Sequence, residues 1–179
     1  RLGRCIRFQA TDDQLRVFAG RDSSGVRGIK LAEGQEVISL VVVGEGLILT
    51  ASENGYGKLT PLEDFPLHGR GGQGVIALQT TERNGSTVAA LQVTTDQEIM
   101  LISSSGTLVR TPVAQVSIVG RNTQGVRIIR LKDNENLVSL ARIAEPDEEE
   151  VIVEEGETAE AVTSSEESTD GSTDGSTEE

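Results

Sequence analysis

The sequence predicts an all-β fold of the propeller type, built from repeated units. Three observations carry this prediction: a recurring phrase, short β-branched runs separated by glycine turns, and no long stretch of capped helical periodicity. Residues 19–31 read AGRDSSGVRGIKL and residues 119–131 read VGRNTQGVRIIRL, with seven of thirteen positions identical. A third copy, HGRGGQGVIALQT, occupies residues 68–80. A period near 50 residues is typical of repeat architectures.

The spacing inside the repeat is constant. The Gly-Arg pairs and the Gly-Val pairs each recur after 49 and then 51 residues, at 20–21, 69–70 and 120–121 and at 25–26, 74–75 and 125–126. A further element, glycine followed six residues later by proline, recurs in SENGYGKLTP and SSSGTLVRTP. We therefore expect about three units, over residues 1–43, 44–93 and 94–143.

Each unit is expected to form four short antiparallel strands. In the last unit these are EIMLIS, TLVRTP, VRIIRL and LVSLARI, and the middle unit has the same order. Asn54-Gly55 and Asn84-Gly85 are typical of two-residue type I′ hairpins, because both residue types tolerate positive φ. Four strands per unit describe a propeller blade, and a ring needs about 4–8 blades. We expect residues 1–143 to be the final part of a larger ring that is cut within its first blade.

The charge is divided between two parts of the chain. The net charge is −13, but residues 145–179 contain fifteen acidic residues and no Lys or Arg. Residues 1–144 then carry a net charge of +2. A tail of Glu, Asp, Ser, Thr and Gly cannot bury enough apolar surface to offset its ordering entropy. Residues 144–179 are therefore predicted to be a disordered acidic tail.

Positive charge recurs at matching places in the units. The loop arginines Arg21, Arg70 and Arg121 share one position, and Lys30 and Arg130 share a strand face opposite the apolar residues beside them. A regular basic stripe without a base-reading module suits the phosphate backbone of a curved polyanion. The candidate DNA-binding residues are Arg7, Arg21, Arg27, Lys30, Lys58, Arg70, Arg110, Arg121, Arg127 and Arg130. Surface arginines that serve only solubility are the alternative explanation.

The sequence offers no catalytic or metal-binding constellation. GRGGQG fits a dinucleotide-binding pattern only formally, because the β-run VIAL follows it in place of a helix. His68 is the only histidine and Cys5 the only cysteine, so no zinc-ligand cluster can form. Tyr56 follows a hairpin glycine and is interpreted as a strand residue.

The phrases VGRNTQGVRIIRL, SENGYGKLTP and TERNG closely resemble the C-terminal domain of the A subunit of bacterial DNA gyrase. The resemblance extends over residues 1–143, and an acidic tail is also typical of that family. It implies a six-bladed β-pinwheel, a propeller that exchanges strands between blades. It also implies a rim that wraps duplex DNA in a positive turn, so that an ATP-dependent type II topoisomerase introduces negative supercoils.

The resemblance implies partners as well. These are double-stranded DNA bound with little sequence preference, the gyrase B subunit and a second A subunit in an A2B2 heterotetramer, within the bacterial cytoplasm and at no membrane. ATP and Mg²⁺ would bind elsewhere in that complex, and this segment would hold no cofactor and no catalytic residue. The equivalent pinwheel of topoisomerase IV and a protein-interaction propeller remain as alternatives.

The sequence departs from the family pattern in its middle unit. The family's Gln-Arg-Arg-Gly-Gly-Lys-Gly box is absent, and HGRGGQG keeps only Arg70 and three of its glycines. Ile76 and Gln79 stand where the outer units have Arg27 or Arg127 and Lys30 or Arg130. We expect this unit to contact DNA weakly.

Overall fold

The structure is a computed structural model, which describes residues 1–17 and 20–143. The described residues all fall within one compact unit. The tail predicted to be disordered, residues 144–179, lies outside the described residues. In the described part of the chain, no helix has the length and apolar character needed to cross a membrane.

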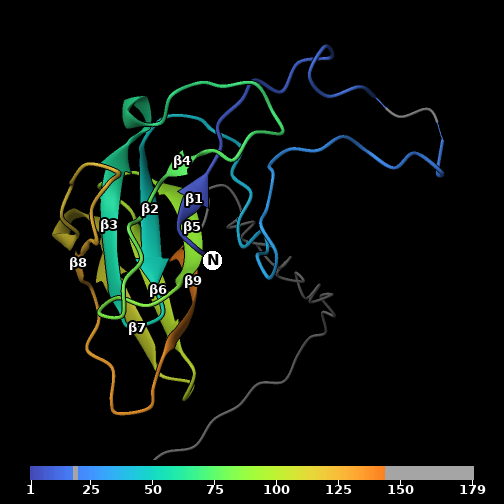
Figure 1. Cartoon of the computed structure of the whole chain (residues 1–179). Coiled ribbons are helices and arrows are strands. Elements are labelled where there is room, and N and C mark those ends of the chain that lie inside the picture. Colours follow the sequence, from blue (N-terminus) through green and yellow to red (C-terminus); the bar gives the residue numbers. More distant parts are fainter. Residues whose placement is uncertain (18–19, 144–179) are drawn as a thin grey trace, which may run out of the picture. The chain divides into compact units, whose positions relative to one another are not determined.

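Nine strands in the described residues form three antiparallel sheets (Figure 1). The smallest sheet pairs β1 (Arg4–Cys5) with β4 (Val75–Ile76). A four-stranded sheet has the order β5-β2-β3-β8, with the bounds Thr87–Val93, Leu47–Ser52, Tyr56–Pro61 and Val126–Arg127. A three-stranded sheet has the order β7-β6-β9, with the bounds Leu108–Pro112, Glu98–Ser103 and Leu137–Ile143. Short 3-10 turns follow β3 and β7, namely η1 (Leu62–Asp64) and η2 (Val113–Gln115).

The strands follow from local sequence. β6 alternates buried and half-buried side chains along EIMLIS, as expected for a strand with one face on the core. β3 and β7 both end at a proline, Pro61 and Pro112, and each proline leads into a 3-10 turn. A proline has no N–H to continue the ladder, so both strands stop at the same place in their repeats.

In the second and third repeats, one strand belongs to the sheet of the preceding repeat. β8 pairs with β3, with Tyr56 opposite Arg127 and Gly57 opposite Val126. β4 pairs with β1 in the same way. We call residues 26–31, 75–80 and 126–131 the Gly-Val segments, since each begins at the valine of a Gly-Val pair. Two of the three Gly-Val segments are therefore exchanged between neighbouring repeats, which confirms the pinwheel expectation.

The core lies mainly between the two larger sheets and is aliphatic. Leu49 and Leu59 from the four-stranded sheet cluster with Ile99 and Leu101 from β6 and with Val113 from η2. All five side chains are fully buried. Such a core needs few aromatic residues, in agreement with the composition.

Of the two predicted type I′ hairpins, the one at Asn54-Gly55 is confirmed as a hairpin between β2 and β3, but its turn type is wrong, and the one at Asn84-Gly85 is wrong. Gly55 and Gly85 have positive φ angles of 79° and 74°, but Asn134 is the only non-glycine residue with positive φ in the described part of the chain. The Asn54-Gly55 turn closes through a bond from Gly55 N to Ser52 O, 3.0 Å long, with glycine alone in the left-handed region. Asn84-Gly85 joins no hairpin, because the strands on either side of it, β4 and β5, belong to different sheets.

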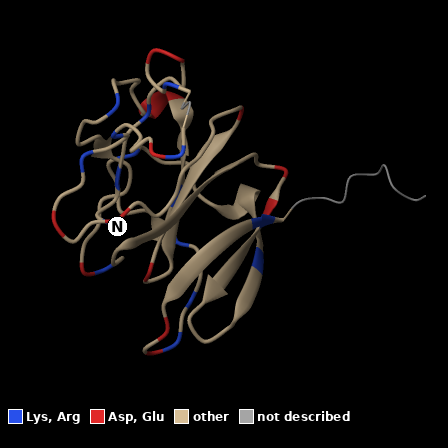
Figure 2. Cartoon of the chain, turned by 90° about the vertical axis from the view of Figure 1, so that its right-hand side faces the viewer, with Lys and Arg blue, Asp and Glu red and all other residues tan. Residues whose placement is uncertain are grey.

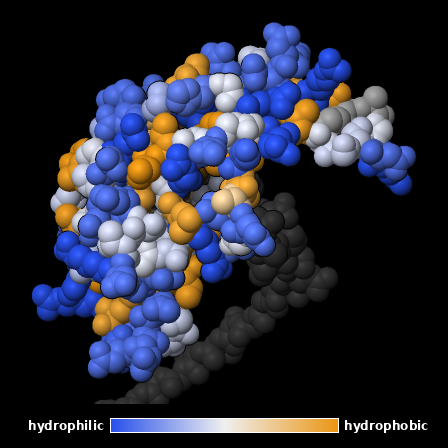
Figure 3. Space-filling model, viewed as in Figure 1, coloured by the Kyte–Doolittle hydropathy of each residue, from blue (hydrophilic) through white to orange (hydrophobic). Residues whose placement is uncertain are grey.

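The first repeat forms fewer strands than the other two. Only β1 is a strand there, and its Gly-Val segment, residues 26–31, is not. By the exchange rule, residues 26–31 would pair with a preceding repeat, and the described residues contain none. Leu40 and Val42 are correspondingly 87% and 89% exposed. Figure 3 shows apolar side chains scattered over a largely hydrophilic surface.

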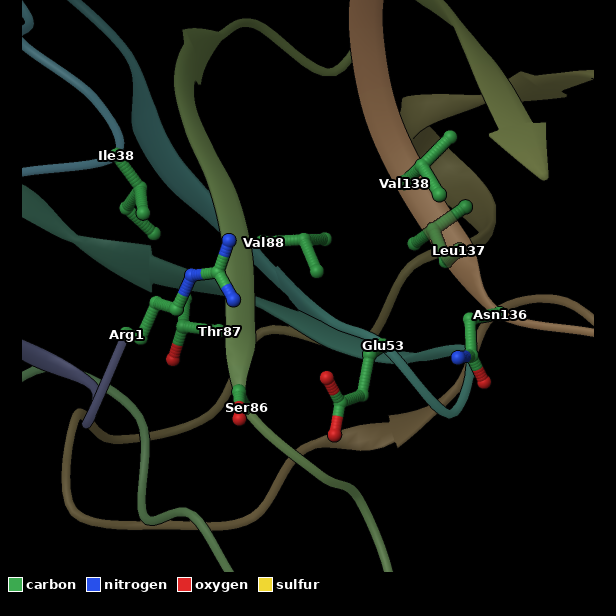
Figure 4. Close-up of a pocket in the computed structure, with 9 residues that line it drawn as sticks. All are labelled: Arg1, Ile38, Glu53, Ser86, Thr87, Val88, Asn136, Leu137 and Val138. Atoms are coloured by element: carbon green, nitrogen blue, oxygen red, sulfur yellow. The ribbon is translucent and has the colours of Figure 1, made fainter. Parts of the chain in front are cut away.

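The four-stranded and three-stranded sheets are joined at Glu53. Its N–H donates to Ser86 O at 2.9 Å, and its carbonyl accepts from Leu137 N at 2.7 Å. Figure 4 shows this joint between the start of β5 and the start of β9. A cavity of about 260 Å³ opens beside it, lined by both aliphatic and polar side chains. Glu53 and Arg1 are the only ionisable residues in that lining, so the cavity offers no catalytic set.

Candidate nucleic-acid interface

The basic residues of the chain all lie in its folded part. All 16 Lys and Arg are found in residues 1–143, together with 14 of the 29 acidic residues. Figure 2 shows basic and acidic positions interspersed over the loops and strand ends. Net charge alone therefore does not mark an interface, and each basic side chain has to be judged by what it contacts.

Two loop arginines donate to backbone carbonyls of the preceding repeat. Arg70 Nη1 lies 3.4 Å from Arg27 O, and Arg121 Nη1 lies 3.1 Å from Ile76 O. Residues 27 and 76 are equivalent positions in their Gly-Val segments. Arg70 Nε also donates to Gln14 O at 2.7 Å. Both arginines are half-buried, so the repeated Gly-Arg pair forms a joint between consecutive repeats.

The cations of the Gly-Val segments have the opposite environment. We call Arg27, Lys30, Arg127 and Arg130 the outer cations, and all four are exposed. Arg21 is exposed as well. The residues that the structure describes provide no hydrogen-bond or ion-pair partner for the side chains of Arg21, Arg27, Lys30 and Arg130. These groups are free to meet an anion in solution.

Lys58 was predicted to contact DNA, but it has no exposed surface and cannot do so in this structure. Its Nζ donates to Gly120 O at 2.7 Å, to Arg121 O, and to Thr123 Oγ1 at 3.2 Å. Burial lowers the pKa of Lys58 to about 8, with Arg121 adding to this and Asp64 opposing it. Lys58 therefore holds the loop that carries Arg121.

Arg7 and Arg110 share a repeat position but differ in environment. Arg7 is half-buried, and its Nη1 donates to Leu62 O and Phe65 O, both at 3.1 Å, at the 3-10 turn η1. Arg110 is exposed and forms an ion pair with Glu98 on the neighbouring strand. That hydrogen-bonded carboxylate raises the pKa of Arg110. Neither arginine is as free to bind an anion as the outer cations.

Arg83 was missed by the sequence reasoning. Its guanidinium carbon lies 4.9 Å from the centre of the Tyr56 ring, and that of Arg127 lies 5.4 Å from the same ring. Arg127 Nη2 also donates to Tyr56 Oη at 2.9 Å. Hydrogen bonds from Arg127 and Arg83 lower the pKa of the tyrosine. Two exposed guanidinium groups thus contact one buried aromatic ring.

The buried side chain of Asn84 holds the loop that carries Arg83. Asn84 is fully buried, and its amide donates to Gln79 O at 2.9 Å and to Gln124 O at 3.1 Å. Its Oδ1 accepts from Thr81 N at 2.7 Å. This side chain joins the second repeat to the third. Asparagine at this position is explained by its side-chain bonds, since its backbone φ is not positive.

Neither the cysteine thiol nor the acidic residues of the described part of the chain form a reactive or metal-binding group. Burial raises the pKa of Cys5 to about 11, so its thiol stays protonated near neutral pH. Within the described residues, no group of three His, Cys, Asp or Glu is placed to hold a metal ion. The outer cations remain as the groups that could recognise a ligand. One of them, Arg127, also belongs to the cluster with Arg83 and Tyr56.

Comparison with known proteins places these features in a family. The family model described as "DNA gyrase C-terminal domain, beta-propeller" matches residues 1–44, 46–94 and 97–144. The A subunit of DNA gyrase from Pseudomonas aeruginosa is 52% identical over 169 residues, covering 93% of this chain and 18% of that protein. The A subunit of DNA gyrase from Salmonella typhimurium is 51% identical over 160 residues, covering 88% and 18%. The chain thus spans about a fifth of the length of these relatives.

Solved structures agree with this assignment. A structure of a DNA gyrase A C-terminal domain superposes with a TM-score of 0.73 at 32% identity, covering 80% of this chain and 48% of that one. The C-terminal domain of a DNA topoisomerase IV gives a TM-score of 0.70 at 20% identity, covering 79% of this chain and 44% of that one. The latter likeness shows the fold alone. The chain belongs to the DNA gyrase C-terminal domain family and is homologous to part of the gyrase A subunit.

Proposed function

We propose that this chain binds duplex DNA through its outer cations and bends it around the edge of the repeats, as the DNA-wrapping module of a gyrase A subunit. The observation that carries the proposal is a match between equivalent positions of two repeats. Arg27 and Lys30 in the first repeat, and Arg127 and Arg130 in the third, occupy matching positions and are all exposed. Charges that repeat at fixed intervals and lack acidic partners suit a phosphate backbone, where affinity comes from counterion release.

The Arg83–Tyr56–Arg127 cluster supplies a second element of the proposed interface. Two guanidinium groups over one ring can both bond phosphate oxygens, because each has five N–H donors and uses few of them within the protein. Arg83 lies in the second repeat, whose Gly-Val segment has no basic residue. The cluster therefore continues the line of positive charge across the repeat that the sequence marks as poor in charge.

The family also suggests a wider activity. Wrapping DNA in a positive turn would let an ATP-dependent type II topoisomerase introduce negative supercoils, with the gyrase B subunit and a second A subunit as partners in an A2B2 complex in the bacterial cytoplasm. ATP hydrolysis and DNA cleavage, with the Mg²⁺ they require, would be performed outside these 179 residues. The contribution of this chain is to position DNA, and none of its side chains takes part in bond breaking.

The proposal is tested with unrelated duplexes of equal length, titrated with the 179-residue chain at several salt concentrations. We expect similar affinities for all duplexes and a linear fall of log affinity with log salt. Relaxation of circular DNA by a nicking-closing enzyme in the presence of the chain should then leave positive supercoils. Binding that is insensitive to salt, or confined to one sequence, would contradict the proposal.

A further inference from the structure

The second repeat lacks a cation at one position where both other repeats have one. Ile76 stands at the place of Arg27 and Arg127, directly after the valine of the Gly-Val pair. It lies in β4, the strand that the second repeat gives to the sheet of β1. The residue opposite it on β1 is Arg4, which the sequence reasoning missed. The structure therefore brings an arginine to the place where this Gly-Val segment has none.

The corresponding pair of residues also contains an arginine where β8 joins β3. We call the pairing of β4 with β1 the first strand exchange and that of β8 with β3 the second. At the second exchange Arg127 of β8 lies opposite Tyr56 of β3. Arg4 and Tyr56 are equivalent, since each directly follows the turn glycine of its repeat. The arginine thus lies on the accepting strand at the first exchange and on the donated strand at the second.

The backbone geometry of the two exchanges matches. The turn glycines Gly3 and Gly55 have φ angles of 65° and 79°. Their carbonyls accept from the N–H groups of residues 77 and 78 and of residues 128 and 129, respectively. Directly opposed residues on one face of antiparallel strands have Cβ atoms about 4.5–5.5 Å apart. A side chain on either strand of the pair therefore starts from the same part of the surface.

The guanidinium of Arg4 is oriented but not neutralised. Its Nε donates to Gln73 O at 3.1 Å and its Nη2 to Gly74 O at 3.0 Å. These bonds use two of its five N–H donors, and the others have no acceptor among the described residues. In the same part of the chain, neither of the two ion pairs involves Arg4. Since the residue is exposed, its remaining donors and its charge are available to an anion.

The loop that orients Arg4 also contacts the Gly-Val segment of the first repeat. The carbonyl of Gly72, one residue before Gln73, accepts from Lys30 N at 2.8 Å. Lys30 is one of the outer cations, and its side chain is exposed. Arg4 and this segment thus contact the same short loop, so Arg4 lies close to positive charge that already belongs to the proposed interface.

A structural role is the alternative for Arg4. Arg70 and Arg121 also donate to backbone carbonyls, and both are half-buried between consecutive repeats. Arg4 and Gln73, by contrast, are both exposed. Water can replace either partner there at little cost in free energy, because an exposed donor and an exposed acceptor both bond to solvent. The two bonds of Arg4 therefore set the direction of its guanidinium more than they stabilise the fold.

We propose that Arg4 is a further DNA contact, which supplies at the first strand exchange the cation that Arg127 supplies at the second. The inference rests on the proposed binding of duplex DNA by this chain. Arg4 fills the gap that Ile76 leaves in the series of cations. Phosphate contacts then continue from the first repeat to the third across a Gly-Val segment that has no charge of its own.

The first test compares Arg4→Gln with Arg142→Gln in the 179-residue chain. Arg142 is the matched control, because it is exposed, has no side-chain partner among the described residues and lies on β9, which pairs with β6 of its own repeat. A labelled duplex is titrated at several salt concentrations. In Arg4→Gln the slope of log affinity against log salt should flatten by about 0.9, for one lost phosphate contact, and affinity should fall about fivefold at 0.1 M salt.

The control and the stability of the variant decide between the two roles of Arg4. The slope of Arg142→Gln should change far less than that of Arg4→Gln, and the urea midpoint of Arg4→Gln should be nearly unchanged. Equal flattening in the two variants would assign the effect to net charge. A lowered urea midpoint with an unchanged slope would assign Arg4 to the fold. Either result would overturn the proposal.

The second test moves the arginine across the strand pair. Arg4→Ile should lose the contact, and Arg4→Ile combined with Ile76→Arg should regain it, because the pair then resembles Tyr56 and Arg127. The double variant has the composition and net charge of the unmodified chain, so its slope and affinity should return to those of that chain. Circular dichroism checks that both variants are folded. A folded double variant that binds no better than Arg4→Ile would contradict the proposal.

This inference and the proposed function can be told apart in the same titrations. If the unmodified chain shows no salt-dependent affinity for duplex DNA, both are wrong. If Arg127→Gln combined with Arg130→Gln flattens the slope and Arg4→Gln does not, only the inference about Arg4 is wrong.

Discussion

Arg121 and Arg130 lie in the same repeat and carry the same charge, but their guanidinium groups have different surroundings. Arg121 is half-buried and donates to Ile76 O, and its own carbonyl accepts from Lys58. Arg130 is exposed, and the residues that the structure describes give it no side-chain partner. The same contrast separates Arg70 from Lys30.

This comparison shows how one repeated residue type can serve two purposes. An arginine that satisfies a buried carbonyl stabilises the junction between repeats, because an unpaired buried acceptor would cost free energy. An arginine in solvent contributes little to folding and can neutralise a phosphate. Arg70 and Arg121, which we call the joint arginines, should therefore affect stability. The outer cations should affect DNA affinity and its dependence on salt.

The largest effect is expected from the outer cations. Replacing Arg27, Lys30, Arg127 and Arg130 together by Gln should weaken duplex binding by roughly 10²–10³-fold at 0.1 M salt, because four phosphate contacts are lost. Unfolding by urea should be nearly unchanged, since surface substitutions usually stay within about 0.5 kcal/mol. Titration of a labelled duplex measures the first quantity. Unaltered affinity in a folded variant would show that DNA contacts another surface.

Lys58→Met should have the next largest effect, on stability. It removes a buried ammonium and leaves Gly120 O and Arg121 O without their donor, which should lower the free energy of unfolding by about 2–4 kcal/mol. Urea denaturation followed by circular dichroism measures this change. At temperatures where the variant is folded, its DNA affinity should change far less than in the outer-cation variant. If the variant were as stable as the unmodified chain but no longer bound DNA, Lys58 would have to be a DNA contact.

The lowered pKa of Lys58 gives this prediction a pH dependence. The folded chain releases the Lys58 proton near pH 8, whereas the unfolded chain holds it to about pH 10.4. Between these values the unfolded state binds more protons, so stability rises with pH. The stability of the unmodified chain relative to Lys58→Met should therefore increase from pH 7.5 to pH 9.5. A constant difference over this range would show that burial does not lower this pKa.

A smaller effect is expected at the joint arginines. Arg70→Gln and Arg121→Gln should each lower the free energy of unfolding by about 1–2 kcal/mol, because each removes a charge-assisted bond to a carbonyl. Arg21→Gln is the matched control, because Arg21 has no such bond among the described residues and its substitution should leave stability nearly unchanged. Thermal denaturation of the three variants measures the contrast. Equal losses in all three would remove the distinction between joint and outer arginines.

The smallest effect is expected at the ion pair of Arg110 with Glu98. Glu98→Gln breaks an exposed pair, so stability should barely change. It also frees Arg110 to meet phosphate, so DNA affinity should rise a few-fold at low salt. Glu45→Gln, at an exposed acidic residue without an ion pair among the described residues, is the control for the change in net charge. A gain of equal size in the control would assign the effect to net charge alone.

Much of the fold could be predicted because the repeat is written in the sequence. The recurring glycines marked the turns, and the runs EIMLIS and LVSLARI became β6 and β9 as expected. The hairpin prediction at Asn84-Gly85 was wrong because it assumed that neighbouring strands in the chain pair with each other. Strand exchange places β4 and β5 in separate sheets, and no local pattern shows which of two equally spaced partners a strand selects.

The candidate site was harder to predict, because exposure depends on contacts between repeats. Lys58 was predicted to contact DNA, but a loop from the third repeat covers it. Arg83 was missed because the corresponding place in the third repeat has Asp133, so no repeated signal marked it. Lys30 and Arg130 were predicted because alternation along a strand places them opposite the apolar residues beside them, and Arg27 and Arg127 because they recur in the outer units. Their contact with DNA stays a prediction.

The central claim is that the outer cations contact DNA and the joint arginines do not. It is tested most directly by the slope of log affinity against log salt for two double variants, Arg127→Gln with Arg130→Gln and Arg70→Gln with Arg121→Gln. Both lose two positive charges, so net charge is matched. We predict that the slope flattens by about 1.8 in the first variant, which is about 0.9 for each lost phosphate contact, and by well under 1 in the second. Equal flattening in both variants would contradict the claim.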